Sequence, residues 1–109
     1  MLNDGTLQAQ QEKSLLIVDD DRRFLTRVAR AMEQRGYSVA IAETVEDGIR
    51  AISTRPPAFA VIDMRLGDGS GLDVIAALKK HSPASRGVIL TGYGNIATAV
   101  TAVKLGAYD

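Results

Sequence analysis

Cysteine and tryptophan are both absent from this chain of 109 residues, and no long apolar run occurs in it. The absence of cysteine excludes disulfide bonds, thiolate chemistry and zinc ribbons. No apolar stretch approaches the ~20 residues that a helix needs to span a bilayer, so we expect no membrane partner. Residues 1–13 also lack the apolar segment of a signal peptide, and we expect them to form a flexible arm on a cytoplasmic protein.

An excess of either charge is also lacking. The 13 basic residues balance 13 acidic ones, which gives a formal net charge of zero. Affinity for phosphate backbones requires a basic surplus or a basic patch, so we expect this segment to bind no nucleic acid by itself. A chain of this length with 46% hydrophobic residues is large enough for one domain with its own core.

Short apolar runs alternate with segments whose apolar residues have helical spacing. The runs are continuous, which is typical of parallel strands covered on both faces. Thr44 and Ser70 each precede an aspartate by three residues, which predicts the start of a helix at both places. Leu72, Ile75 and Leu78 would line the second of these helices. The alternation predicts an α/β fold with a doubly wound parallel sheet. The expected strands are 15–18, 39–42, 58–62 and 88–90, and the expected helices follow each of them, the last over 95–105.

Acidic and hydroxyl side chains stand where three of these strands end. Asp19, Asp20 and Asp21 follow the first strand, Asp63 ends the third, and Thr91 ends the fourth. The carboxyl ends of parallel strands lie along one edge of the sheet, which is where such folds bind ligands. Clustered carboxylates repel one another unless a cation offsets their charge. Oxygen ligands without histidine or cysteine favour a hard cation, and Mg²⁺ fits best.

Each of these residues also has a simpler interpretation. Asp20 or Asp21 could cap the helix that begins near Arg22. Asp63 could accept N–H groups from the glycine-rich turn that follows it, and Thr91 could be an ordinary hydroxyl at a strand end. Three separate strand ends would then supply such groups by coincidence, so the joint pattern favours the metal site.

Three segments, "LLIVDDD", "VIDMRLGDGSGLD" and "VILTGYGNIATAVTAVKLGA", resemble the first, third and fourth strand–loop units of a response-regulator receiver domain, a CheY-like domain. The amino-acid sequences of these segments are similar to those of the redox-responding RegA/ActR-type regulators. The likeness runs from about Ser14 to the end of the chain. It implies a flavodoxin-like sheet with strand order 2-1-3-4 and a receiver domain over residues 14–109.

The resemblance also implies the metal ligands and the reacting group. Asp63 matches the aspartate that is phosphorylated. Asp20, with Asp19 acting through water, matches the acidic pair that holds Mg²⁺. The main-chain carbonyl of Arg65 would supply a further metal ligand, so that Asp63 is both a ligand and the phosphoacceptor.

The remaining implied roles concern the phosphoryl group. Thr91 matches the hydroxyl that hydrogen-bonds it and moves on activation, and the main-chain N–H groups of Gly92 and Arg65 would face its oxygens. The implied partner is a sensor histidine kinase. The implied output is transcriptional, through a DNA-binding domain that this segment does not contain.

Two features depart from the family pattern. Gly67 stands where proline is frequent, which loosens the turn. The sequence also stops before the family's fifth strand and helix, which carry the switch aromatic and a lysine that pairs with the phosphoryl group; neither Lys104 nor Tyr108 matches them. We therefore expect a C-terminally truncated receiver with an open sheet edge, which associates with a second copy of itself.

Two other classes of function remain open. A small Mg²⁺-dependent phosphohydrolase of similar topology would need a second aspartate two residues after the nucleophile, where Arg65 stands. A degenerate receiver would serve only as a protein-interaction module. The retained acids and Thr91 favour a phospho-accepting switch, which is not a conventional enzyme beyond a weak autophosphatase activity.

Overall fold

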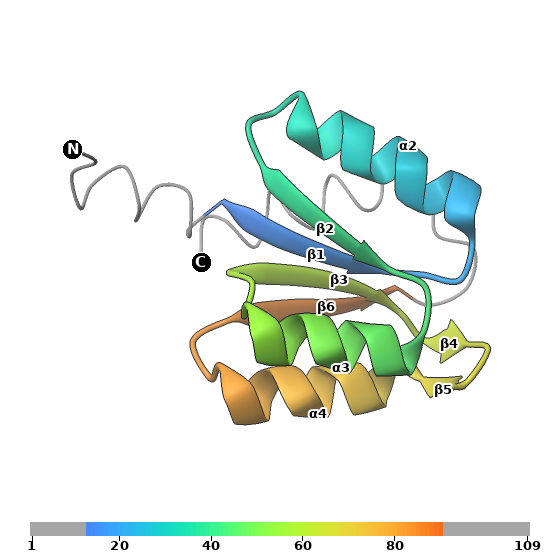
Figure 1. Ribbon diagram of the computed structural model, residues 1–109, viewed down its shortest axis with the longest axis vertical. Helices are drawn as coiled ribbons and strands as arrows, with labels where there is room; N and C mark the ends of the chain where they lie inside the picture. Colours follow the sequence, from blue (N-terminus) through green and yellow to red (C-terminus); the bar gives the residue numbers. More distant parts are fainter. Residues whose placement is uncertain (1–12, 91–109) are drawn as a thin grey trace.

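A parallel sheet of four strands forms the centre of the computed structural model, which describes residues 13–90 (Figure 1). The strand order is β2-β1-β3-β6, so the predicted fold class and the predicted order of the four long strands are confirmed. Val18 at the end of β1 pairs with Ala42 of β2 and with Ile62 of β3. The strands are β1 (Ser14–Val18), β2 (Ser38–Ala42), β3 (Phe59–Asp63) and β6 (Arg86–Leu90).

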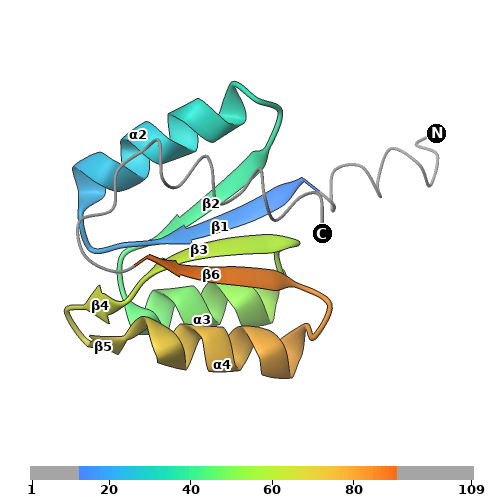
Figure 2. The same cartoon turned by 180° about the vertical axis from the view of Figure 1, so that it is seen from behind.

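Three described helices connect these strands and cover both faces of the sheet. Helix α2 (Arg22–Glu33) lies on one face, while α3 (Val45–Thr54) and α4 (Gly71–His81) lie side by side on the other (Figures 1 and 2). Parallel neighbouring strands require a crossover connection, and each helix supplies one. None of these described helices is long and apolar enough to cross a membrane.

The core consists of two clusters, one on each face of the sheet. Side chains of a strand point alternately to opposite faces. Leu15 and Ile17 therefore pack toward α2, whereas Leu16 and Val18 pack toward α3 and α4. All four are at most 1% exposed, so β1 is buried on both faces, as the continuous apolar run predicts.

The predicted helix starts are confirmed by side-chain caps. The Asp21 carboxylate accepts the N–H of Phe24 at 3.1 Å, so Asp21 is the N-cap of α2 and the simpler interpretation holds for it. Thr44 accepts the N–H of Asp47 at 3.0 Å at the start of α3. Ser70 caps α4 by accepting the N–H two residues further on. These short-range bonds set where each helix begins.

Two predictions about burial are wrong in part. Strands β2 and β6 keep exposed residues, among them Ile41 at 48%, because they lie at the two ends of the described strand order. Leu72 is 55% exposed and does not line the core. Gly71, Val74 and Leu78 form the buried stripe of α4, and Leu72 lies off that stripe by one residue.

Some sequence predictions fall outside the described residues. These are the arm predicted over residues 1–13, of which the structure describes only Lys13, the residues Thr91 and Gly92, and the helix predicted over 95–105. The described strands begin at slightly different residues from the predicted ones: β3 begins one residue later, and β6 begins at Arg86, whereas Asp63 ends β3 as predicted. Inside the glycine-rich turn, the structure adds a short antiparallel hairpin, β4 (Arg65–Leu66) and β5 (Gly69–Ser70).

Candidate functional site

Three aspartates meet at the carboxyl ends of β1 and β3. Asp19 and Asp20 follow directly after β1, and Asp63 is the last residue of the neighbouring strand β3. One carboxylate oxygen from each of the three lies within 4.8 Å of the other two. The predicted convergence of these acids is therefore confirmed, because adjacent parallel strands end at the same edge of the sheet.

The side chain of Asp19 is half-buried and is hydrogen-bonded to the main chain. Its carboxylate accepts the N–H of Asp21 at 2.8 Å, and its own N–H donates to the carbonyl oxygen of Ala42 at 3.0 Å. Burial is the main cause that raises the pKa of Asp19 from 3.8 to about 6, against the lowering effect of the Asp21 N–H. The negative charges of Asp63, Asp20 and Asp21 raise this pKa further. The ionised form of Asp19 is thus disfavoured where it stands.

Asp63 is half-buried at the end of an otherwise buried strand. Burial raises its pKa, and the negative charge of Asp20 acts in the same direction. The N–H of Arg65, 3.5 Å from Oδ1, and the positive charge of Arg65 lower it. Because Asp63 is only half-buried, a reacting group can reach it from solvent.

The set of donor atoms fits a hard divalent cation. All three groups are carboxylates, and Mg²⁺ and Ca²⁺ both prefer oxygen ligands. The pKa values of Asp19 and Asp63 are raised partly by like charges, and a bound cation would remove that repulsion. The residues present therefore fit the predicted metal.

The raised pKa of Asp19 predicts a pH-dependent stability. The folded state holds the proton up to about pH 6, and the unfolded chain releases it near 3.8, so the free energy of unfolding falls as the pH rises between these values. Asp19 is half exposed, and solvent screening reduces the effect to about 1 kcal/mol. We expect Asp19→Asn to raise the free energy of unfolding by about 1 kcal/mol above about pH 7, measured by urea unfolding without divalent cations.

Below about pH 3 the same substitution should change little, because Asp19 is then protonated in both the folded and the unfolded state. An equal gain at both pH values would show that relief of charge at Asp19 is not the cause. Asn keeps an oxygen that can accept the N–H of Asp21, so the comparison isolates the charge.

The hairpin β4–β5 holds the chain immediately after Asp63. Arg65 pairs with Ser70, and the N–H of Gly71 donates to the carbonyl oxygen of Met64 at 2.8 Å. Leu66 is 8% exposed and belongs to the core cluster under α3 and α4. Arg65 therefore begins a segment that is anchored to the core close to Asp63, while its role as a metal ligand stays a prediction.

Two residues that support this site, Asp68 and Gly71, were not predicted from the sequence. The Asp68 carboxylate, at the tip of the hairpin, accepts the N–H groups of Val45 and Glu46 at 2.8 and 3.2 Å. These bonds lower the pKa of Asp68, that from Val45 most. Gly71 closely approaches the backbone of Asp63. No local pattern marks either contact, because the partners are 8 to 23 residues away in the sequence.

Thr91 and Gly92 lie outside the described residues. The described part of β6 ends at Leu90, which pairs with Asp63 and whose carbonyl oxygen accepts the N–H of Met64 at 3.1 Å. The roles of Thr91 and Gly92 therefore stay predictions.

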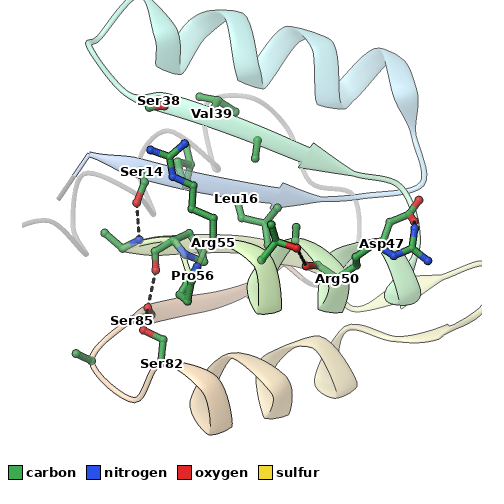
Figure 3. Close-up of a pocket in the computed structure, with 17 residues that line it drawn as sticks. Ser14, Leu16, Ser38, Val39, Asp47, Arg50, Arg55, Pro56, Ser82 and Ser85 are labelled. Carbon is green, nitrogen blue, oxygen red and sulfur yellow. Dashed lines mark hydrogen bonds and ion pairs between the residues drawn. The ribbon is translucent and has the colours of Figure 1, made fainter. Parts of the chain in front are cut away.

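An open groove of about 1110 Å³ runs along α3 toward the amino ends of the strands (Figure 3). Residues that precede or begin strands line part of it, such as Ser14, Ser38 and Pro57. Arg50 of α3 and Arg55, the residue that ends this helix, line another part. None of the three clustered aspartates lines it. The acidic site is thus an exposed edge of the sheet and is separate from this groove.

Comparison with known families decides what kind of domain carries this site. The sequence model of the protein family described as the response regulator receiver domain matches residues 15–109. The chain belongs to this family. Receiver domains are signalling domains of two-component response regulators, and the family binds Mg²⁺ at an acidic pocket.

Curated relatives of this receiver domain are bacterial regulatory proteins. The acid tolerance regulatory protein ActR of Sinorhizobium medicae is 66% identical over 98 residues, which are 90% of this chain and 50% of that protein. The photosynthetic apparatus regulatory protein RegA of Rhodobacter capsulatus is 60% identical over 98 residues, 90% of this chain and 53% of that protein. The chain spans about half the length of these relatives. The resemblance to RegA and ActR is confirmed.

Solved structures agree with the fold of this receiver domain. A response regulator from Burkholderia pseudomallei with a phosphorylated aspartic acid, a calcium ion and citrate is 40% identical, with a TM-score of 0.71 over 86% of this chain and 55% of that chain. A CheY-like receiver domain from Methanospirillum hungatei is 31% identical, also with a TM-score of 0.71, over 86% of this chain and 75% of that chain.

Proposed function

We propose that this receiver domain accepts a phosphoryl group on Asp63 from a sensor histidine kinase. The convergence of Asp19, Asp20 and Asp63, with Asp63 only half-buried, is the observation that carries the proposal. The Burkholderia pseudomallei regulator, whose structure contains a phosphorylated aspartic acid and a calcium ion, supports it.

The chemistry requires a nucleophile that can reach an anionic donor. An Oδ atom of Asp63 attacks the phosphorus of a phosphohistidine, a P–O bond forms as the P–N bond breaks, and the released imidazole nitrogen takes up a proton. The product is an acyl phosphate on Asp63. Bound Mg²⁺ supplies neutralisation of charge on the phosphoryl oxygens. Asp19, Asp20, Asp63 and the carbonyl of Arg65 would hold the ion.

The phosphorylated state would be recognised by residues at the neighbouring strand end. A phosphoryl group adds about −1.5 to −2 charges and three acceptor oxygens. The hydroxyl of Thr91 and the N–H of Gly92 would hydrogen-bond these oxygens, and movement of Thr91 would transmit the change. We place the protein in the cytoplasm, with transcription as the output through a DNA-binding domain outside this segment. Self-association of the chain stays a prediction from its sequence.

A hydrolase and a pure interaction module are less well supported. Arg65 lies two residues after Asp63, where a phosphohydrolase of similar topology needs an aspartate for acid–base catalysis. A module that has lost phosphorylation has no need for three carboxylates crowded within 4.8 Å, because their repulsion destabilises the fold.

Incubation with acetyl phosphate and Mg²⁺, followed by intact mass spectrometry, tests the proposal. We expect one phosphoryl group to be added and peptide mapping to place it on Asp63, with no addition when a chelator removes Mg²⁺. Release of phosphate over many turnovers without accumulation would support the hydrolase. An unchanged mass, together with unchanged amide spectra in beryllofluoride, would support the interaction module.

A further inference from the structure

The start of α3 donates hydrogen bonds to side chains from two different parts of the chain. A helix leaves its first N–H groups without partners inside the helix. At α3, Thr44 accepts the third of these groups, that of Asp47, from within the same segment. The first two, those of Val45 and Glu46, are bound by the two oxygens of Asp68 from the tip of the β4–β5 hairpin. Asp68 thus links two segments, whereas Thr44 caps only its own helix.

The hairpin has one anchor at its base and another at its tip. At the base, Leu66 packs into the core and Gly71 bonds to Met64. At the tip, the carboxylate of Asp68 binds α3, beside which the hairpin lies in Figure 1. Arg65 stands between Asp63 and this tip. The path of the main chain at Arg65 therefore depends on both anchors.

A carboxylate suits this contact better than any other side chain of its length. Both of its oxygens accept hydrogen bonds, and its charge is favourable at the positive end of a helix. The lowered pKa of Asp68 is consistent with an ionised group at this place. Asparagine offers one acceptor oxygen and would direct an NH₂ group at the second N–H donor. Asp68 is exposed, so packing of the core does not require it.

We propose that Asp68 is a positioning residue for the metal site, which holds the hairpin against α3 and so sets where the main-chain carbonyl of Arg65 lies. The inference rests on the proposed function, because it assumes that this carbonyl faces Mg²⁺. It gives Asp68 a role outside the ligand set: it acts on the metal through the hairpin and touches neither the ion nor the phosphoryl group. By linkage, binding of the metal should in turn strengthen the contact of Asp68 with α3.

The test compares Asp68→Ala and Asp68→Asn with Thr44→Ala in the full chain. Thr44→Ala removes a cap from the same helix without releasing the hairpin, so it is the matched control. In metal-free protein, we expect Asp68→Ala to speed amide hydrogen exchange over residues 64–70 at least about tenfold, Asp68→Asn to have a smaller effect, and Thr44→Ala to leave this segment unchanged. In calorimetric titration, Asp68→Ala should raise the Kd for Mg²⁺ about tenfold.

Several outcomes would overturn the proposal. Equal effects of Asp68→Ala and Thr44→Ala on the Kd would show that only the stability of α3 matters. Faster hydrogen exchange with an unchanged Kd for Mg²⁺ would show that Asp68 holds the hairpin but does not position the metal site. Unchanged exchange would show that Asp68 does not hold the hairpin either. If the unsubstituted chain binds no Mg²⁺, the proposed function fails, while the exchange data still decide whether Asp68 holds the hairpin.

Discussion

Asp63→Asn should leave the protein unable to acquire a phosphoryl group from acetyl phosphate. The amide has nearly the shape of the carboxylate, so the end of β3 should remain folded, but its nitrogen and oxygen are poor nucleophiles at neutral pH. Removal of a covalent nucleophile typically lowers the rate by more than about a thousandfold. Intact mass spectrometry over time measures the loss directly.

Asp47→Asn provides the control for this experiment. Asp47 is an exposed acid on α3 that pairs with Arg50 at 3.4 Å and takes no part in the cluster. The Asp47→Asn protein should acquire a phosphoryl group at the same rate as the unsubstituted chain. If Asp63→Asn still gained a phosphoryl group at the original rate, another carboxylate would be the acceptor, and the assignment of Asp63 would be wrong.

Gly71→Ala should destabilise the fold by about 3 kcal/mol, at the upper end of what overpacking typically costs. A Cβ atom on Gly71 would clash with the carbonyl oxygen of Asp63 and would lie 2.9 Å from Cγ2 of Ile62. The first of these atoms belongs to the backbone of a paired strand and has no room to move. Because the clash is with Asp63 itself, we expect phosphorylation to fall together with the free energy of unfolding.

Gly67→Ala is the matched glycine substitution. Nothing lies within 4 Å of a Cβ atom built at Gly67, and its φ is not positive. It should be neutral or stabilise by up to about 1 kcal/mol, since alanine reduces the entropy of the unfolded chain. Urea unfolding of both variants measures the difference. Equal stabilities of the two variants would show that the backbone of Asp63 can move away from a Cβ atom at position 71.

The elements that depend on local chemistry could be predicted from the sequence. The buried run of β1 and the caps at Asp21 and Thr44 need only neighbouring residues, and the structure confirms them. The proximity of Asp19 to Asp63 could also be predicted, because the carboxyl ends of parallel strands lie along one edge of the sheet. This prediction required no knowledge of side-chain contacts.

The features that sequence reasoning missed depend on distant partners. Leu72 fits an apolar helical pattern, yet the stripe that meets the sheet is displaced by one residue, and only packing decides this. In the sequence Asp68 resembles an ordinary turn residue, because its partners, Val45 and Glu46, belong to helix α3, which is distant in the chain. Gly71 is indistinguishable from other turn glycines until the backbone of Asp63 is placed beside it.

The division of β1 between two clusters also protects the position of the acids. If β1 slid by one residue against its neighbours, Leu15 and Ile17 would exchange sides with Leu16 and Val18. Both cores would then have to repack at once, which makes such a slip far less favourable than in a strand with one polar face. The carboxylates that follow Val18 are therefore held at a fixed depth by the hydrophobic side chains of the strand that precedes them.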